Sequence, residues 1–440
     1  MKLNTAPPPV FTHEGGPASR VSPLEELRRT TAACLLWEDG FYESGQSIAD
    51  RIKELVPLCE PRSVFGIAVE ARTKHRLRHL PLLLARELAR HPVAHDRYLV
   101  ASLLPEVIQR ADELTEFLAI YWAEGRQTLS AAVKRGLADA FGRFDEYALA
   151  KYNRDAAVKL RDVLFMVHAK PKDEAQADLW KRLASGELNP PDTWEVALSS
   201  GADKRETFER LLLERKLGYL ALLRNLRNMH EARVNPYLIR QALRDGAGRS
   251  KVLPFRFIAA ARAVPQWEDV LDEAMQAATS ELPALPGTTC VLVDVSGSMA
   301  EKLSAKSDMR RIDAAAGLAV LVREIADGGI VCRFNLTAET VPPRRGMALV
   351  DAIGAPGGGT YLGRSIQQVA EAFPTLDRLI VITDEQSADH VGPPPAGCRG
   401  YIINVATNQR GVGYGDWIHV NGFSESVVSY IQEIEAAAAA

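Results

Sequence analysis

Three oxygen-bearing side chains alternate along one short stretch of this sequence. Asp294, Ser296 and Ser298 form the pattern D-x-S-x-S at the end of the apolar run 288–295. The run is rich in β-branched residues, which is typical of a buried parallel strand. In open α/β sheets, ligands bind outside the carboxyl ends of such strands. A carboxylate with two hydroxyls is a hard oxygen donor set, which favours Mg²⁺ or Mn²⁺ over zinc or copper.

Two later stretches offer further oxygen donors. Thr360 follows the glycines 357–359, and Asp384 ends a second apolar strand that begins at Arg378. Because the carboxyl ends of parallel strands open on the same edge of a sheet, we expect Asp294 and Asp384 to lie close together. The sequence therefore predicts one octahedral Mg²⁺ (or Mn²⁺) site completed by water. The predicted metal ligands are Asp294, Ser296, Ser298, Thr360 and Asp384.

A catalytic role for the same acid is the least favoured alternative. A strand-end Asp with Mg²⁺ could hydrolyse phosphate esters through an aspartyl nucleophile. Such sites use a second acid two residues on and a nearby Lys, but position 296 is Ser and no Lys lies near Asp384. The sequence also lacks a Walker loop, a G-x-S-x-G motif and an H-E-x-x-H motif. We therefore predict that the protein is not an enzyme.

The metal motif resembles that of a known domain family. D-x-S-x-S, a glycine-preceded Thr360 and the strand-end pair Thr383-Asp384 together resemble the metal-ion-dependent adhesion site (MIDAS) of von Willebrand factor A domains. The resemblance implies direct ligation by the three hydroxyls, with the two carboxylates acting directly or through water. It also implies that an acidic residue of a protein partner fills the open metal position.

Length and composition indicate a multidomain globular protein. A chain of 440 residues is too long for one ordinary core. No apolar run approaches the roughly 20 residues of a membrane span, so we expect no membrane partner. The five scattered cysteines, without a C-x-x-C pair, indicate reduced thiols in a cytoplasmic protein. A net charge of −3 does not favour nucleic-acid binding over the whole surface, so we expect no DNA partner, and RNA binding would depend on local basic patches.

The pattern of elements divides the chain into three parts. Residues 1–22 are polar and rich in Pro and Gly, which predicts an extended arm. Residues 23–285 show helical periodicity broken by Pro or Gly, which predicts HEAT-like paired-helix repeats, with an irregular all-α domain as the alternative. Residues 286–440 alternate strands and helices, which predicts a doubly wound, Rossmann-like α/β domain. The predicted strands are 288–295, 329–334, 378–383, 400–405 and 417–420, and the predicted helices of this domain are 308–326, 346–353, 362–373 and 424–437.

Basic residues gather in three stretches of the helical part, 71–80, 151–170 and 223–233. Arg and Lys on repeat helices can follow a phosphate backbone, and each contact makes binding sensitive to salt. An ordinary solvated helix face is the alternative for any one stretch, and a buried structural role is the alternative for His168. The candidate RNA-binding residues are Arg72, Lys74, Arg76, Arg78, Lys151, Arg154, Lys159, Arg161, His168, Lys170, Arg224 and Arg227.

Several segments of the chain are similar to the TROVE domain, which defines the Ro autoantigen family of ribonucleoproteins. They are Lys151-Tyr152, Arg161-Asp162-Val163-Leu164, His168-Ala169-Lys170-Pro171 and the stretches 222–226, 253–257 and 13–16. Members of this family place a von Willebrand factor A domain directly after the helical domain, which is also the order here. The resemblance implies a helical ring whose basic hole takes a single-stranded RNA end, while structured RNA lies along the outer surface.

Two functions follow from these resemblances. The leading interpretation is a non-catalytic scaffold for small noncoding (Y-like) or misfolded RNA, acting in RNA quality control or processing. The alternative is a metal-dependent protein–protein adaptor that does not bind RNA. It is motivated by Leu160, which occupies the position where vertebrate relatives have an RNA-contacting His. The expected protein partner is an RNA-processing enzyme that donates an acidic residue to the metal.

Overall fold

The computed structural model describes most of the chain, in two compact units. The helical unit comprises Pro23–Leu36 and Gly45–Val196, and the mixed unit comprises Met1–Ser22, Trp37–Ser44 and Ala197–Ala440. The described residues are 10–11, 17–18, 22–32, 45–74, 77–153, 156–250, 252, 254–280, 282–303, 309–405, 414–421, 428, 431–432 and 435.

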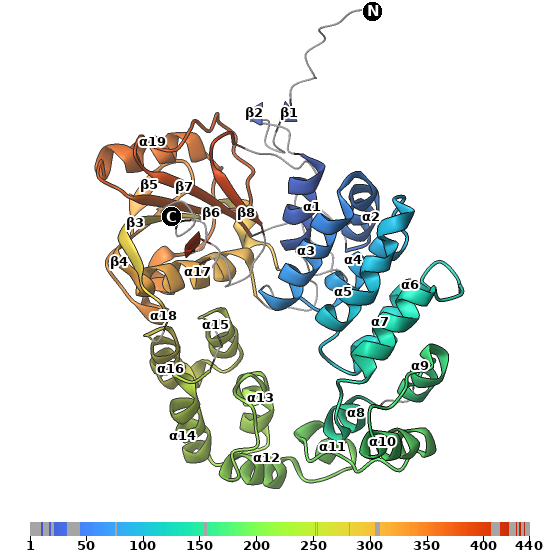
Figure 1. Cartoon of the computed structure of the whole chain (residues 1–440). Helices are drawn as coiled ribbons and strands as arrows, with labels where there is room; N and C mark the ends of the chain where they lie inside the picture. Colours follow the sequence, from blue (N-terminus) through green and yellow to red (C-terminus); the bar gives the residue numbers. More distant parts are fainter. Residues whose placement is uncertain are drawn as a thin grey trace, which may run out of the picture. The chain divides into compact units, whose positions relative to one another are not determined.

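The helical unit consists of short helices that pack in two layers. Most helices contact the next but one along the chain, as α3 does with α5 and α5 with α7, which is the packing of helical repeats. Buried residues from the whole unit form one apolar core. Figure 1 labels its helices, which are α1 (Pro23–Ala32), α2 (Gly45–Leu55), α3 (Pro61–Thr73), α4 (His79–Ala89), α5 (Val100–Val107), α6 (Asp112–Tyr121), α7 (Ala131–Phe141), α8 (Glu146–Tyr152), α9 (Leu160–Val167) and α10 (Glu174–Ser185). The 3-10 turns η1 (Val56–Leu58) and η2 (Ala94–Leu99) also belong to this unit, and α11 (Trp194–Ser199) follows at its end.

Local sequence explains where these helices begin and end. Pro61 occupies the first turn of α3, where its missing N–H costs no hydrogen bond. The side chains of Asp145 and Asp173 cap α8 and α10 by accepting hydrogen bonds from backbone N–H groups. Gly186, with φ +82°, ends α10 in the left-handed conformation that glycine adopts without strain. The helical pattern predicted for this part of the chain is therefore confirmed.

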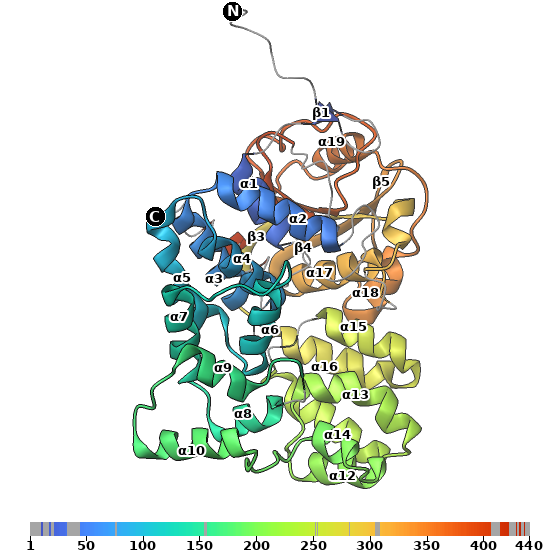
Figure 2. The same ribbon diagram turned by 90° about the vertical axis from the view of Figure 1, so that its right-hand side faces the viewer.

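The mixed unit opens with helices of the same kind. Figure 2 shows them stacked one pair upon the next, and each again contacts the next but one. They are α12 (Lys204–Leu213), α13 (Tyr219–Glu231), α14 (Pro236–Ala247), α15 (Pro254–Ala263) and α16 (Glu268–Ser280), with the 3-10 turn η3 (Pro265–Trp267) before α16. Helical repeats thus continue up to the start of the sheet, as the sequence predicts.

A six-stranded sheet follows, in the order β5-β4-β3-β6-β7-β8. All neighbouring pairs are parallel except β4 and β5. The five predicted strands are confirmed, while the sequence missed β5, a three-residue edge strand too short for a periodic pattern. The strands are β3 (Leu285–Asp294), β4 (Ala326–Phe334), β5 (Ala338–Thr340), β6 (Arg378–Thr383), β7 (Arg399–Asn404) and β8 (Ile418–Asn421).

Helices cover both faces of the sheet (Figure 1). Helix α17 (Arg311–Ile325) packs against β3 and β4 on one face, next to α18 (Gly346–Ile353). Helix α19 (Leu362–Ala372) forms a core on the other face with side chains such as Leu292 and Val381. Because both faces are covered, every residue of β6 is buried, which explains its unbroken apolar sequence. The helix predicted at 424–437 lies largely outside the described residues.

The two compact units divide the chain at a different place from the predicted domains. Secondary structure changes from helix to sheet at Leu285, where β3 begins, close to the predicted boundary. Helices α12–α16 nevertheless belong to the mixed unit, in which α15 and α16 pack against α17, and Asp272 on α16 accepts a hydrogen bond from the backbone N–H of Met347 at 2.8 Å. Within the predicted arm, Val10–Phe11 pairs with Pro17–Ala18 as two short antiparallel strands, β1 and β2, and most other arm residues lie outside the description.

Candidate functional site

Asp294 is the last residue of β3, and its carboxylate is fully buried. Its Oδ1 accepts a hydrogen bond from the backbone N–H of Ser296 at 2.7 Å. Its Oδ2 accepts a hydrogen bond from the hydroxyl of Thr383, on the adjacent strand β6, at 2.6 Å. Both oxygens are therefore fixed, one by the loop that follows and one by the neighbouring strand.

The two serines of the D-x-S-x-S stretch lie side by side. Their Oγ atoms are 3.3 Å apart, with Ser296 buried and Ser298 half-buried. The chain turns here through a 3-10 helix, η4 (Gly297–Ala300). This turn is what brings alternate hydroxyls to the same side as the carboxylate of Asp294.

The glycine-rich loop is held directly against the serine loop. The N–H of Gly297 donates to the carbonyl of Gly358 at 3.0 Å, and the N–H of Gly357 donates to the carbonyl of Val295 at 2.7 Å. Gly358 has φ +83°, which a residue with a side chain rarely adopts. The loop then places Thr360 in a buried position, where its carbonyl accepts a hydrogen bond from the N–H of Ala388 at 2.8 Å.

Asp384 follows β6 directly and is also fully buried. Burial raises the pKa of the Asp294 carboxyl to about 7, and the negative charge of Asp384 contributes to the shift. The two carboxylates therefore lie near enough to repel each other. A bound cation would offset this repulsion.

The structure brings the five predicted metal ligands to one edge of the sheet, on loops that hydrogen-bond to one another. Two carboxylates and three hydroxyls are a donor set of the kind that Mg²⁺ and Mn²⁺ prefer. In the part of the chain that the structure describes, no group of three or more His, Cys, Asp and Glu side chains could hold a metal. The hydroxyls would thus have to contribute, and the residues present fit a hard divalent cation.

Two features of this site were missed by the sequence prediction. Arg311 points its guanidinium at Asp384, with Nη1 3.3 Å from Oδ2. Glu385, the second acid after β6, has φ +60° and contacts His419 Nδ1 at 2.6 Å and Asn404 Nδ2 at 3.2 Å. These partners lie 19 to 73 residues apart in sequence, so no local pattern indicates them.

The basic stretch 71–80 is largely neutralised within the helical unit, which corrects its prediction as an RNA surface. Arg72 is only 6% exposed, and its Nη2 lies 2.8 Å from Oε1 of the buried Glu113. Arg78 forms ion pairs with three acids at the start of α6, Asp112, Glu113 and Glu116. These cations therefore hold α3 and α4 against α6. Lys74 is exposed and lies 3.7 Å from Glu70, and Arg76 lies outside the described residues.

The basic stretch 151–170 is more exposed to solvent than the stretch 71–80. Arg161, His168 and Lys170 are exposed, and Lys159 is half-buried. His168 ends α9 with φ +54°. Because its side chain is exposed, the alternative of a buried structural role for His168 is wrong.

Two other positions of this stretch, Lys151 and Leu160, are less exposed. The ammonium of Lys151 lies 5.7 Å from the ring centroids of both Tyr147 and Tyr152. Leu160 is 2% exposed and packs into the core, and Arg154 lies outside the described residues.

Helix α13 carries the third basic stretch. Arg224 and Arg227 are exposed and three residues apart, so they share one side of the helix. Leu222, Leu226 and Met229 are buried on the opposite side. The helix thus carries two exposed arginines on one side.

Residues 181–321 match the family model of the TROVE domain. The chain contains a TROVE domain. The match includes the stretches 222–226 and 253–257, and it runs on into β3 and α17. The segments between 151 and 171 lie before it.

A solved structure supports the same fold over nearly the whole chain. The crystal structure of the Deinococcus radiodurans Ro (RSR) protein matches with a TM-score of 0.64 and 21% identity, covering 92% of this chain and 98% of that one. This likeness shows that the TROVE helices and the α/β sheet follow the fold of that protein. An aerotolerance-related membrane protein from Bacteroides fragilis matches at 16% identity over 34% of this chain and 99% of that one, with a TM-score of 0.25, too low to support an argument. The comparison with curated proteins finds no match.

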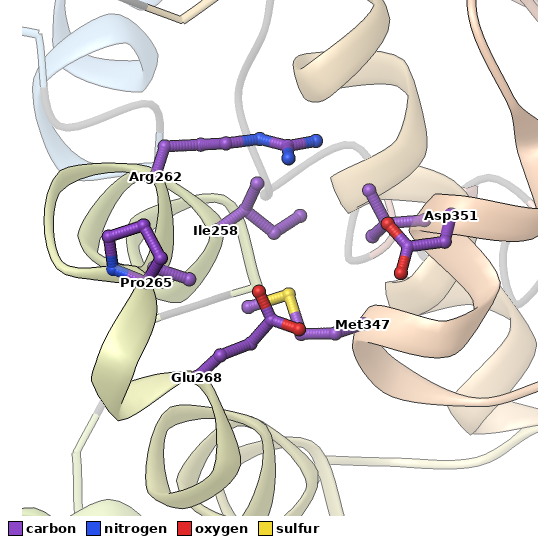
Figure 3. Close-up of a pocket in the computed structure, with 8 residues that line it drawn as sticks. Ile258, Arg262, Pro265, Glu268, Met347 and Asp351 are labelled. Carbon is purple, nitrogen blue, oxygen red and sulfur yellow. The ribbon is translucent and has the colours of Figure 1, made fainter.

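Other parts of the TROVE-containing chain add little to the site. A cavity of about 100 Å³ lies among α15, α16 and α18, lined by Ile258, Arg262, Glu268, Met347 and Asp351 among others (Figure 3). It shares no residue with the predicted metal site. None of the described helices is long and apolar enough to span a membrane. Four cysteines are free thiols, and Cys34 lies outside the described residues.

Proposed function

We propose that this TROVE-domain protein is a non-catalytic scaffold for small noncoding (Y-like) or misfolded RNA, in cytoplasmic RNA quality control or processing. The observation that carries the proposal is the exposed pair Arg224 and Arg227 on α13, within the stretch that matches the TROVE domain. Guanidinium groups bind phosphate oxygens through paired hydrogen bonds. Two such groups on one side of a helix suit an RNA backbone.

A second exposed group supports the same proposal. Arg161 lies in the first turn of α9 in the helical unit, and His168 and Lys170 lie just after its last residue; all three are exposed. Cations at the ends of short helices can contact phosphates without reading bases, which suits recognition of RNA by shape and single-stranded ends. Such binding would tolerate many sequences.

The α13 contacts can be tested with a double substitution. We expect R224Q/R227Q to weaken binding of a structured RNA with a single-stranded 3′ end. Each phosphate contact contributes about 0.7 to 0.9 to the slope of log affinity against log salt, so the slope should fall by about 1.5. Fluorescence anisotropy across a salt series measures both quantities.

A matched control lies on the next helix. Arg240 and Arg244 on α14 are paired with Asp269 and Glu273, so R240Q/R244Q should leave RNA binding nearly unchanged. Equal losses in the two double variants would contradict a specific role for α13. Absence of binding by the wild-type chain at low salt would refute the RNA proposal itself.

A second candidate function is a metal-dependent adaptor for a protein partner. It is favoured by the three interlocked loops and by an exposed apolar pair beside them. Leu336 is 50% and Tyr361 39% exposed, and both lie in van der Waals reach of a Cβ placed on Gly359. We propose that Mg²⁺ or Mn²⁺, held by the five predicted ligands, would present a positive charge to an acidic residue of an RNA-processing enzyme.

The adaptor function separates cleanly from RNA binding in experiment. Asp294→Ala should abolish capture of protein partners in the presence of Mg²⁺ and leave RNA affinity unchanged. Partners that survive both this substitution and EDTA would refute the adaptor function. We expect no turnover of phosphate esters or RNA ends, and metal-dependent turnover lost in Asp294→Ala would show a hydrolase instead.

A further inference from the structure

Arg311 places a permanent positive charge inside the predicted metal centre. Its side chain is buried at the start of α17, with Nη1 3.3 Å from Asp384 Oδ2 and 3.5 Å from the carbonyl oxygen of Ser298. A guanidinium stays protonated at all physiological pH values. The centre therefore contains a cation of its own between two of its loops.

The backbone holds Arg311 in this position. After the serine loop the chain turns back on itself, so that Lys302 and Arg310 form an antiparallel bridge. The N–H of Leu303 donates to the carbonyl of Met309, and the N–H of Arg311 donates to the carbonyl of Glu301, both at 2.9 Å. The position of Arg311 is thus fixed by chain pairing and not only by its own side chain.

The charged groups near one another determine the net charge of the predicted centre. With both carboxylates ionised, Asp294, Asp384 and Arg311 sum to −1, where two carboxylates alone would give −2. A divalent cation brings the sum to +1. Repulsion between Arg311 and the cation lowers affinity, and the positive loaded centre attracts a further carboxylate. Glu385 does not supply it, because its side chain is held by His419 and Asn404.

We propose that Arg311 is a positioning residue that sets the charge and the affinity of this metal centre. It holds Asp384 in place and keeps cation binding weak, so that a partner's acid is needed for tight occupancy. The inference rests on the metal centre of the adaptor function. If Arg311 served only to stabilise the fold, neutralising it would not tighten metal binding.

Binding of Mn²⁺ to the full chain tests this role. The signal of free Mn²⁺ in electron paramagnetic resonance measures affinity at pH 8. Loss of a charge this close should tighten binding by about tenfold or more, so R311M should bind more tightly than wild type. R311K keeps the charge and should restore the wild-type affinity. R378M is the matched control and should leave Mn²⁺ affinity unchanged. Arg378 is also buried, but it begins β6, at the opposite end of the strand from Asp384.

A double substitution covers the case in which R311M fails to fold. Removing Arg311 alone leaves Asp384 buried with an uncompensated charge, whereas removing both charges of a buried pair is better tolerated. D384N retains Arg311 and sums to 0, so it should bind Mn²⁺ more weakly than wild type. R311M/D384N sums to −1 and should bind about tenfold more tightly than D384N.

The possible results separate a failure of the Arg311 role from a failure of the metal centre on which it rests. A folded R311M that binds no more tightly than wild type overturns the role of Arg311, as does a double variant that binds no more tightly than D384N. In both cases the metal centre itself stands. Absence of Mn²⁺ binding in wild type and R311M alike overturns the centre and the inference with it.

Discussion

Arg72 and Arg161 are both arginines of the helical unit, yet only one presents its charge to solvent. Arg72 is enclosed and paired with Glu113, while the side chain of Arg161 is 48% exposed. A guanidinium enclosed in this way is occupied in holding helices together. Burial and pairing, which the sequence does not display, decide which of the two can meet a phosphate.

Arg72→Met should destabilise the helical unit without any RNA present. Glu113 would remain fully buried, keeping hydrogen bonds from the N–H groups of Gln109 and Arg110 and a contact with Arg78. Because these partners persist, we expect a loss of about 3 kcal/mol, the lower end for a broken buried pair. Urea denaturation followed by circular dichroism measures it. The exposed neighbour provides the control, since Lys74→Met should change stability by less than about 0.5 kcal/mol.

Strand β6 has a predicted metal ligand after its last residue and a largely buried ion pair at its first. Its carboxyl end leads to Asp384 in the predicted metal site, and its first residue, Arg378, hydrogen-bonds to Glu435. Burial raises the pKa of Glu435, but hydrogen bonds from Arg378 and Tyr401 and the charge of Arg378 outweigh it and lower the pKa overall. The ion pair thus anchors the strand at the end away from the predicted metal site.

Glu435→Gln should reduce stability in a manner that depends on pH. The folded-state pKa lies below the unfolded value, so the pair stabilises the fold above the unfolded pKa and loses this effect as pH falls through the folded value. We expect a loss of about 2 kcal/mol at pH 7, less than for a fully enclosed pair because Glu435 is 13% exposed. Urea titrations at several pH values should show wild type and variant converging in acid. A difference that grows below pH 4 would contradict this account.

Helices α16 and α18 meet at a glycine. Gly346 has φ +56°, and a Cβ there would lie 2.0 Å from Oδ1 of Asp272, the atom that accepts the N–H of Met347. Gly346→Ala should therefore cost about 2 kcal/mol or more, through backbone strain and the displaced cap. Thermal unfolding measures the loss. Gly392→Ala, at a position with open space and no positive φ, should have little effect.

At the scale of the whole chain, the two proposed functions use separate residues. The exposed cations of α13 and α9 would bind RNA, and the loops after β3 and β6 with the glycine loop would bind the metal. Energetic coupling between two sites requires an element whose state both sites bias. Helix α13 contacts α15, which contacts α17, but no side chain of α13 takes part in the predicted metal site, so we expect the sites to act independently.

Independence gives a direct prediction. EDTA or Asp294→Ala should change RNA affinity by less than about threefold, and R224Q/R227Q should leave Mn²⁺ affinity unchanged within a similar margin. Fluorescence anisotropy and electron paramagnetic resonance measure the two affinities on the same samples. A large effect in either direction would show coupling, and linkage then requires an equal effect in the other direction.

The order of the elements followed from the sequence because their signals are local. Apolar periodicity marked the helices, and unbroken apolar runs marked the parallel strands. The topology of parallel strands also predicted that Asp294 and Asp384 meet, since strand ends share one edge. The short edge strand β5 was missed because three residues, half-buried and exposed, carry no such signal.

The tertiary structure alone decided which charged residues remain available to bind RNA or to act in the predicted metal centre. Arg72 was predicted at an RNA surface and is buried against Glu113, 41 residues away, while Arg311 was overlooked and lies beside Asp384, 73 residues away. Charge pairing depends on distances of a few ångströms between segments that are far apart in the chain. The sequence by itself determined the fold class and the metal motif, whose signals are local. Long-range packing determined which cations hold the structure together and which one lies in the predicted metal centre.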